Sequence, residues 1–287
     1  MAPIKIEIIR LLTMDLSIFQ YPFVRNAFLA GSIVAVTAGF IGYFLAARGL
    51  VFAGHALSHI GFAGAAGALV LGIDPIFGLF FFTIVSGIGI GATGKNLREE
   101  DMNIGIIMML MLGMGALFIS LYSGYAERAY SILFGTILGI TGTDVLVTVA
   151  FGIAVCAVLA VIGRPLLFAS IEPEVAEARG VPVRLLGIVF LVLVAVAVSM
   201  AAVVVGILLV FTLLVGPAAT AMRLTRRPGS AMALSIVLAL LYTWLGIFLA
   251  ATSAWPVSFY IASISFAAYV AVRLLKPMIG KMKTHPV

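Results

Sequence analysis

Residues 25–75 read RNAFLAGSIVAVTAGFIGYFLAARGLVFAGHALSHIGFAGAAGALVLGIDP, and this stretch decides the fold class. It contains two apolar runs, 24–47 and 51–72, joined by a short link that carries Arg48. A helix needs about 20 apolar residues to cross a bilayer. The runs lack the short alternating segments of a membrane barrel. The stretch therefore predicts two membrane-spanning helices.

The composition extends this prediction to the whole chain of 287 residues. It is 63% hydrophobic and 10% charged, with a mean hydropathy of +1.26, whereas a soluble domain carries about 25% charged residues. We therefore expect an all-α polytopic membrane protein with a single transmembrane domain over 1–287. The candidate spans are 24–47, 51–72, 76–94, 103–124, 144–163, 184–204, 205–222, 231–251 and 257–275. The sixth and seventh are nearly continuous, so eight helices or nine are expected.

The distribution of lysine and arginine predicts the orientation. With nine spans, 13 of the 17 Lys and Arg residues fall on one side of the membrane and four on the other. Because cytoplasmic loops are enriched in these residues, the N-terminus is expected outside and the C-terminus in the cytoplasm. Residues 1–23 then form an outer amphipathic segment, 164–183 a cytoplasmic loop and 276–287 a cytoplasmic tail. A further segment, 127–143, is too short and glycine-rich to cross and is expected to be re-entrant or interfacial.

Two patterns suggest soluble functions, and both are weak. The net charge of +6 is spread thinly without interleaved aromatic residues, so it favours cytoplasmic loops over nucleic-acid binding. The glycines and lysine of GIGATGKN (89–96) resemble a phosphate-binding loop, but Asn96 replaces the Ser or Thr that such a loop requires, and no soluble strand precedes it. We expect these glycines to permit close helix packing.

Two of the three histidines, His55 and His59, lie four residues apart in the second span. Residues at this spacing share one face of a helix, so both rings are expected to point the same way. The neighbouring residues are small, which predicts that the face is turned into protein. Neutral imidazole binds transition metals, and ionisable residues inside a membrane often mark ion pathways. A metal-ion pathway is therefore the main hypothesis, and a hydrogen bond from each ring to a neighbouring helix is the structural alternative.

The stretch HALSH also resembles the zinc-protease motif HExxH. Its glutamate position is occupied by Ala56, and a protease needs a third ligand. The nearest intramembrane acid, Asp144, stands at a helix start where capping explains it. An intramembrane metalloprotease is therefore a less favoured alternative.

The chain resembles the membrane permease of zinc/manganese/iron-type ABC importers over nearly its whole length. The resemblance includes residues 25–75, AYSILFGTILGIT (129–141), EPEVAEARGVPV (172–183), LLVGPAATA (213–221) and WPVSFYIASIS (255–265). It implies a homodimeric, multi-pass permease of the bacterial cytoplasmic membrane. It also implies two cytoplasmic ATPase subunits and an extracytoplasmic metal-binding protein, so that the chain itself is no enzyme and holds its metal only as cargo.

The resemblance also assigns residues. The family motif reads Gly-Asp-Ala-x-Ser-His, and its Asp and His contact the travelling ion. His59 matches the His, and His55 stands in place of the Asp. Replacing a carboxylate by an imidazole disfavours manganese more than zinc, so zinc is the expected cargo, with manganese or iron as alternatives.

The remaining implied roles lie near the two membrane surfaces. Four residues match the coupling helix that meets the ATPase: Glu172, Glu174, Glu177 and Gly180. Thr136 stands where relatives often carry an acidic or other polar residue, at an outer gate. Pro217 is expected to break the seventh span as a hinge or a static kink. A permease for a metal chelate, such as a siderophore or cobalamin, is the alternative within transport.

Overall fold

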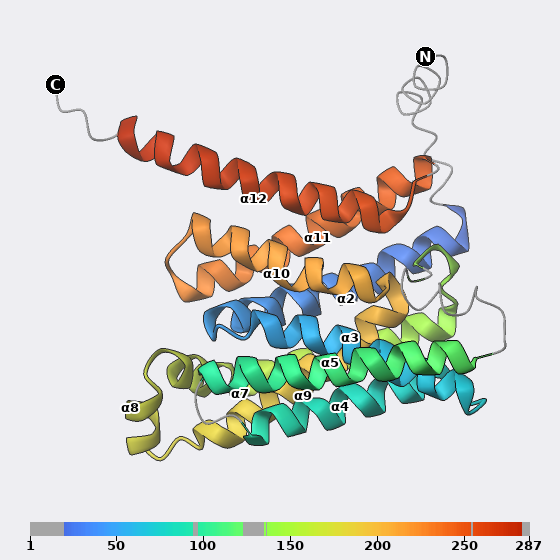
Figure 1. Cartoon of the computed structure of the whole chain (residues 1–287). Coiled ribbons are helices and arrows are strands. Elements are labelled where there is room, and N and C mark those ends of the chain that lie inside the picture. The colour runs from blue at the N-terminus through green and yellow to red at the C-terminus, as the bar shows by residue number, and fades with distance from the viewer. Residues whose placement is uncertain (1–19, 94–96, 123–134, 136, 254, 283–287) are drawn as a thin grey trace.

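The structure is a computed structural model that describes residues 20–93, 97–122, 135, 137–253 and 255–282. Nine long helices in these ranges form one bundle (Figure 1). They are α2 (Pro22–Ala47), α3 (Val51–Val70), α4 (Pro75–Thr93), α5 (Leu97–Leu121), α7 (Gly142–Ile171), α9 (Val183–Val205), α10 (Ile207–Leu224), α11 (Pro228–Thr252) and α12 (Val257–Met282). Two short helices, η2 (Ile137–Gly139) and α8 (Pro173–Ala178), complete the described elements.

The helices agree with the prediction of a polytopic membrane protein. Eight of those in the described ranges are long and apolar enough to cross a membrane. The other long helix, α3, has 20 residues but carries both histidines, which lower its mean hydropathy. Because α3 packs inside the bundle against α4, α5, α9 and α10, it belongs to the same helical layer as the rest.

One glycine separates the sixth helix from the seventh. α9 ends at Val205 and α10 begins at Ile207, and Gly206 between them has φ +84°. This left-handed conformation favours glycine, because it has no Cβ. The amide of Gly206 still donates a hydrogen bond to the carbonyl of Ala202, which closes the last turn of α9. The interruption supports nine helices.

The helices run back and forth between the two ends of the bundle (Figure 1). α8 and the C-terminal end of α12 lie at one end, and α2 begins at the other. The links after α2, α7 and α10 all fall at the α8 end, where α4 also ends and α5 begins. These links carry Arg48, Arg179, Arg226 and Arg227, and Arg184 and Arg223 lie in adjoining helix turns, so several of the cations that the sequence assigns to one side gather at this end of the folded chain.

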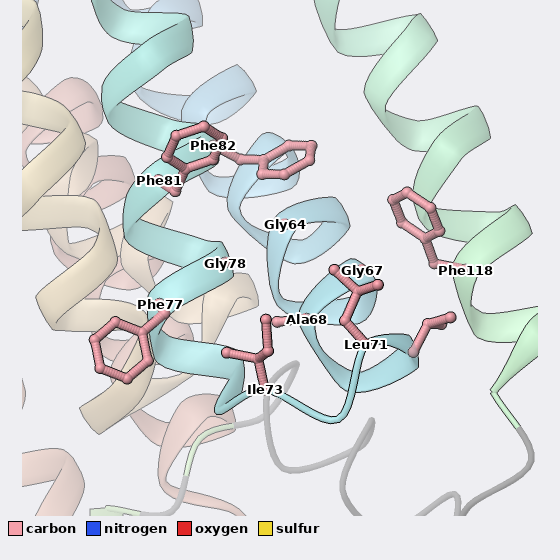
Figure 2. A pocket seen from close by; sticks show the side chains of 11 residues that line it. Gly64, Gly67, Ala68, Leu71, Ile73, Phe77, Gly78, Phe81, Phe82 and Phe118 are labelled. Atoms are coloured by element: carbon pink, nitrogen blue, oxygen red, sulfur yellow. The ribbon is translucent and has the colours of Figure 1, made fainter.

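Small residues allow α3 and α4 to touch backbone to backbone. Gly64 and Gly78 face each other so closely that a Cβ on either one would overlap the other's carbonyl oxygen. Figure 2 shows this crossing beside an apolar pocket of about 520 Å³, which α5 closes with Phe118. The expectation that the small face of this segment permits close approach is confirmed.

Two predicted boundaries are wrong, because the helices extend further. α7 continues through Arg164 and Pro165 to Ile171, so the link begins at 172 and not at 164. Pro165 removes one hydrogen bond, but Leu166 and Ala169 beyond it are buried, and this packing holds the helix together. α12 likewise continues to Met282 into the predicted tail. Residues 1–19, and most of the expected re-entrant segment, lie outside the described residues.

The glycines of GIGATGKN and the intramembrane acid Asp144 both have structural explanations. Gly89 and Gly91 lie inside α4, and a Cβ at Gly91 would press on Ile188 of α9, so this glycine serves helix packing. Asp144 forms a capping box with Thr141 at the start of α7: the carboxylate accepts the Thr141 amide at 3.0 Å. Capping accounts for this acid, as expected.

Candidate metal-ion site

The start of α3 positions the histidine pair. The chain leaves α2 through Gly49, at φ +72°, and Leu50 precedes the first turn of α3. His55 and His59 follow one turn apart, and both side chains are half-buried. Their ring centroids are 4.6 Å apart and the ring planes cross at 82°. The prediction that both imidazoles share one face is therefore confirmed, but the prediction that this face is turned into protein is met only in part: both rings stay half-exposed, because the small residues Gly61 and Gly64 pack against α4 on the other side of the helix.

The pair belongs to a half-exposed stripe on α3 that also contains Phe52 and Phe62. The spacing of three, four and three residues keeps the four side chains on one face. The stripe runs between α5 and α10. A Cβ at Gly115 of α5 would lie 3.4 Å from Phe62. On the other side, the ring of Phe211 in α10 meets the ring of His55 edge-on, at 4.7 Å.

Neither imidazole forms a hydrogen bond with any residue that the structure describes. The alternative of interhelical hydrogen bonds is therefore not realised there. The nearby hydroxyl of Ser58 donates instead to the carbonyl of Gly54, within its own helix. The ring nitrogens remain available to a ligand on the open face of α3.

The donor set limits what this site can do. Over the described ranges, no group of three or more His, Cys, Asp or Glu side chains lies close enough to hold a metal ion. Two imidazoles cannot complete a tetrahedral zinc site, and no third protein ligand for a hydrolytic centre is present in that part of the chain. Two nitrogen donors on a half-open face suit an ion that arrives and leaves.

The aromatic surroundings are not evident from the sequence. Phe211 is 152 residues after His59, in a different helix, and nothing in the local pattern VFTLLVG announces a contact with His55. The one available signal is the spacing of Leu208, Phe211 and Val215, which lie on the incompletely buried face of α10. This spacing could have suggested that Phe211 faces a neighbouring site.

A second candidate region lies at the α8 end of the bundle. α8 begins with Pro173 and ends before Arg179, and Gly180 turns the chain at φ +80°. Glu172, Glu174 and Glu177 are exposed. Ala176 is fully buried and anchors the helix to the bundle. Three exposed carboxylates therefore lie on α8 or directly before it, and the buried side chain of Ala176 packs the helix against the bundle.

The two other predicted residues fare differently. Thr136 lies outside the described residues. Pro217 is buried inside α10, and the helix continues past it to Leu224, so the predicted break at Pro217 is wrong. The interruption falls 11 residues earlier, at Gly206, because that residue adopts a conformation closed to other amino acids. A hinge role for Pro217 stays a prediction.

Comparison with known proteins identifies the family. Residues 20–276 match the model of the ABC 3 transport family. The manganese transport system membrane protein MntC of Halalkalibacterium halodurans is 31% identical over 211 residues, which cover 73% of this chain and 72% of the relative. The manganese import system permease protein ScaB of Streptococcus parasanguinis is 32% identical over 231 residues, or 80% and 82% of the two chains.

Solved structures agree with this assignment. The structure of PsaBC from Streptococcus pneumoniae in complex with Fab matches with a TM-score of 0.79 and 27% identity, over 89% of this chain and 92% of that one. An inward-facing putative metal-chelate type ABC transporter matches with a TM-score of 0.66 at 18% identity and shares the fold. The expected resemblance to metal-importer permeases is confirmed, and the chain belongs to the ABC 3 transport family.

Proposed function

We propose that this chain is the transmembrane subunit of an ATP-driven importer that carries a divalent transition metal ion across the bacterial cytoplasmic membrane. The observation that carries the proposal is the pair of imidazoles, 4.6 Å apart on the half-open face of α3 and without a hydrogen bond in the described structure. Relatives named for manganese transport support a metal as the cargo.

The donor set favours zinc. Imidazole nitrogen is a good ligand for zinc and a poorer one for manganese. The two rings hold an ion weakly, and weak binding suits transport because the ion must also leave. In a two-fold dimer with α3 near the axis, two copies would present four imidazoles to one ion.

Manganese is the second candidate, and the relatives favour it. MntC and ScaB are named for manganese, and they resemble this chain over 70–80% of its length. Manganese prefers oxygen donors. In the family motif the first ligand is a carboxylate, and this chain has His55 there. The identity of the metal thus depends chiefly on whether position 55 contacts the ion.

The partners follow from the ends of the bundle. We assign α8 to contact with a cytoplasmic ATPase subunit, because it is short, anchored by Ala176 and carries exposed Glu174 and Glu177. The assembly comprises two copies of this chain, two ATPase subunits that hydrolyse the ATP and an extracytoplasmic metal-binding protein. The cationic α8 end faces the cytoplasm and the start of α2 faces outward.

The test is metal uptake into a zinc- and manganese-starved bacterial host that expresses the complete transporter. Wild type is compared with His55→Asp while zinc and manganese compete. We expect the wild type to prefer zinc and His55→Asp to gain manganese. Ser58→Ala is the control, because its hydroxyl is bonded within α3. Equal selectivity in wild type and His55→Asp would remove position 55 from the site, and uptake of neither metal by the wild type would refute the proposed function.

A further inference from the structure

A second cavity lies at the α8 end of the bundle, away from the histidines. Its volume is about 290 Å³, and it is enclosed by α2, α7 and the first turns of α11. Most of its wall is hydrocarbon and aromatic: Phe40, Phe44, Leu159, Leu167 and Met232. Two polar side chains, Tyr43 and Arg164, complete the lining. The cavity therefore combines an apolar wall with a small number of polar groups.

The two polar groups have no partners in the described part of the chain. Tyr43 is 5% exposed, yet its hydroxyl makes no hydrogen bond to any described residue. The hydroxyl oxygen is not fully buried and Tyr43 lines the cavity, so this group is available to a ligand or ordered water there. The guanidinium of Arg164, which is exposed, likewise forms no ion pair or hydrogen bond with the residues described.

One cation, Arg164, lines the cavity, and two more precede the helix that forms its edge. α11 begins at Pro228, after Arg226 and Arg227, and Pro228 and Gly229 line the cavity. No side chain of the N-cap residue caps this helix; Pro228 has no amide hydrogen and the Arg227 amide donates to the hydroxyl of Thr225, so Gly229 and Ser230 supply the amides without an intrahelical acceptor. The lining contains no acidic residue. The guanidinium of Arg164 and the backbone of Gly229 thus line one cavity.

We propose that this cavity binds an anionic phospholipid of the leaflet on the α8 side. The phosphate would be held by the hydroxyl of Tyr43 and the guanidinium of Arg164, and the start of an acyl chain would lie against Phe40 and Leu167. Basic pockets between transmembrane helices at the cytoplasmic surface are typical sites for anionic headgroups. A free phosphate ion would leave the apolar wall uncovered.

The position of the cavity gives the lipid a structural consequence. Arg164 and Leu167 lie in the last part of α7, and the chain passes from α7 through Glu172 directly into α8. A bound lipid would join this part of α7 to α2 and α11. This inference depends only on the membrane location of the bundle and is independent of the metal.

The first experiment measures lipid-dependent thermal stability of the purified full chain in detergent. Phosphatidylglycerol, phosphatidylcholine and inorganic phosphate are added separately, and bound lipid is counted by native mass spectrometry. We expect phosphatidylglycerol alone to raise Tm. Arg164→Gln is expected to weaken the binding of phosphatidylglycerol at least about tenfold, and Tyr43→Phe to weaken it by about three- to tenfold. Arg273→Gln is the control, because it removes a cation of α12 outside the cavity. This variant is expected to bind phosphatidylglycerol as tightly as the wild type does.

Three outcomes would overturn the proposal. Equal stabilisation by phosphatidylcholine would show that the effect is not specific for anionic lipid. Equal stabilisation by inorganic phosphate would identify a soluble anion as the ligand. Equal losses in Arg164→Gln and Arg273→Gln would show a general effect of net charge.

A second variant tests the same cavity by blocking it without changing any charge. Its result does not depend on Arg164 or Arg273. Gly229 lines the cavity and a Cβ there would meet no atom within 4 Å, so Gly229→Leu is expected to fold and to narrow the cavity opening. It should keep the wild-type Tm in phosphatidylcholine and lose the shift with phosphatidylglycerol. Gly113→Leu on α5, where a Cβ would also meet open space, is the matched control. Retained phosphatidylglycerol binding in Gly229→Leu would exclude the cavity as the site.

Discussion

The two sides of α3 are built in opposite ways. Toward α4, Gly64 meets Gly78 with no room for a Cβ, and Gly61 packs on Thr83. Toward α5 and α10, His55 and His59 lie half-exposed, and neither has a hydrogen bond in the described structure. The packed side fixes the position and rotation of the helix, and that rotation decides where the imidazoles point. The rigid side thus preorganises the open side.

The largest effect is expected from breaking the packed side. Gly64→Val would drive a branched side chain into the backbone of Gly78, and overpacking of this kind costs about 3 kcal/mol or more. We expect loss of folded protein, measured by size-exclusion profile and thermal unfolding in detergent. Gly113→Ala, at an open helix position, should leave both unchanged. A stable Gly64→Val protein would show that α3 and α4 can separate without loss of the fold.

On the open side, the reverse pattern is expected. His59→Ala removes a ligand of the proposed metal site but no described hydrogen bond, so metal uptake should fall by about 10- to 100-fold or more while Tm stays at the wild-type value. Uptake by metal-depleted cells and thermal unfolding of the purified protein measure the two quantities. Normal uptake would remove the histidine pair from the pathway, and a large drop in Tm would make His59 a structural residue.

A smaller functional effect is expected from Phe211, whose ring meets the edge of His55. An aromatic pair contributes about 0.5–1.5 kcal/mol, so Phe211→Leu should reduce uptake at limiting zinc by about two- to tenfold. Phe80→Leu is the matched control, because it disrupts a ring pair with Phe151, whose centroids are 5.2 Å apart, away from the site. Similar losses of metal uptake in both variants would show that the effect comes from general packing and not from the contact between Phe211 and His55.

The smallest effect is expected where a polar pair supports the packed side. Thr83 of α4 and Ser199 of α9 share a buried hydrogen bond of 2.7 Å. Ser199→Ala should cost about 1 kcal/mol, visible as a shift of a few degrees in Tm, with uptake unchanged. The exposed hydroxyl of Ser120, bonded within α5, provides the control Ser120→Ala. An uptake defect in Ser199→Ala would show that the packed side takes part in transport.

Much of the fold could be read from the chain. Each of the nine predicted spans corresponds to a helix, because about 20 consecutive apolar residues in a membrane have few alternatives to a helix. The helix ends were less predictable. The fifth span was expected to end at 163 and Pro217 to break the seventh, yet α7 and α10 continue through Pro165 and Pro217, because packing against neighbouring helices can compensate for one missing hydrogen bond.

The sequence by itself determined the class of protein, the positions of the candidate spans and the sharing of one helix face by His55 and His59, but it left eight helices or nine open. These features depend on hydropathy and on spacing within one element, and both are local. The tertiary structure decided that the histidines lie between α5 and α10, that Phe211 meets His55, and that Tyr43 and Arg164 share a cavity. Each of these joins helices far apart in the chain, and their relative rotation is set by packing between surfaces such as Gly64 on Gly78, which no local pattern encodes.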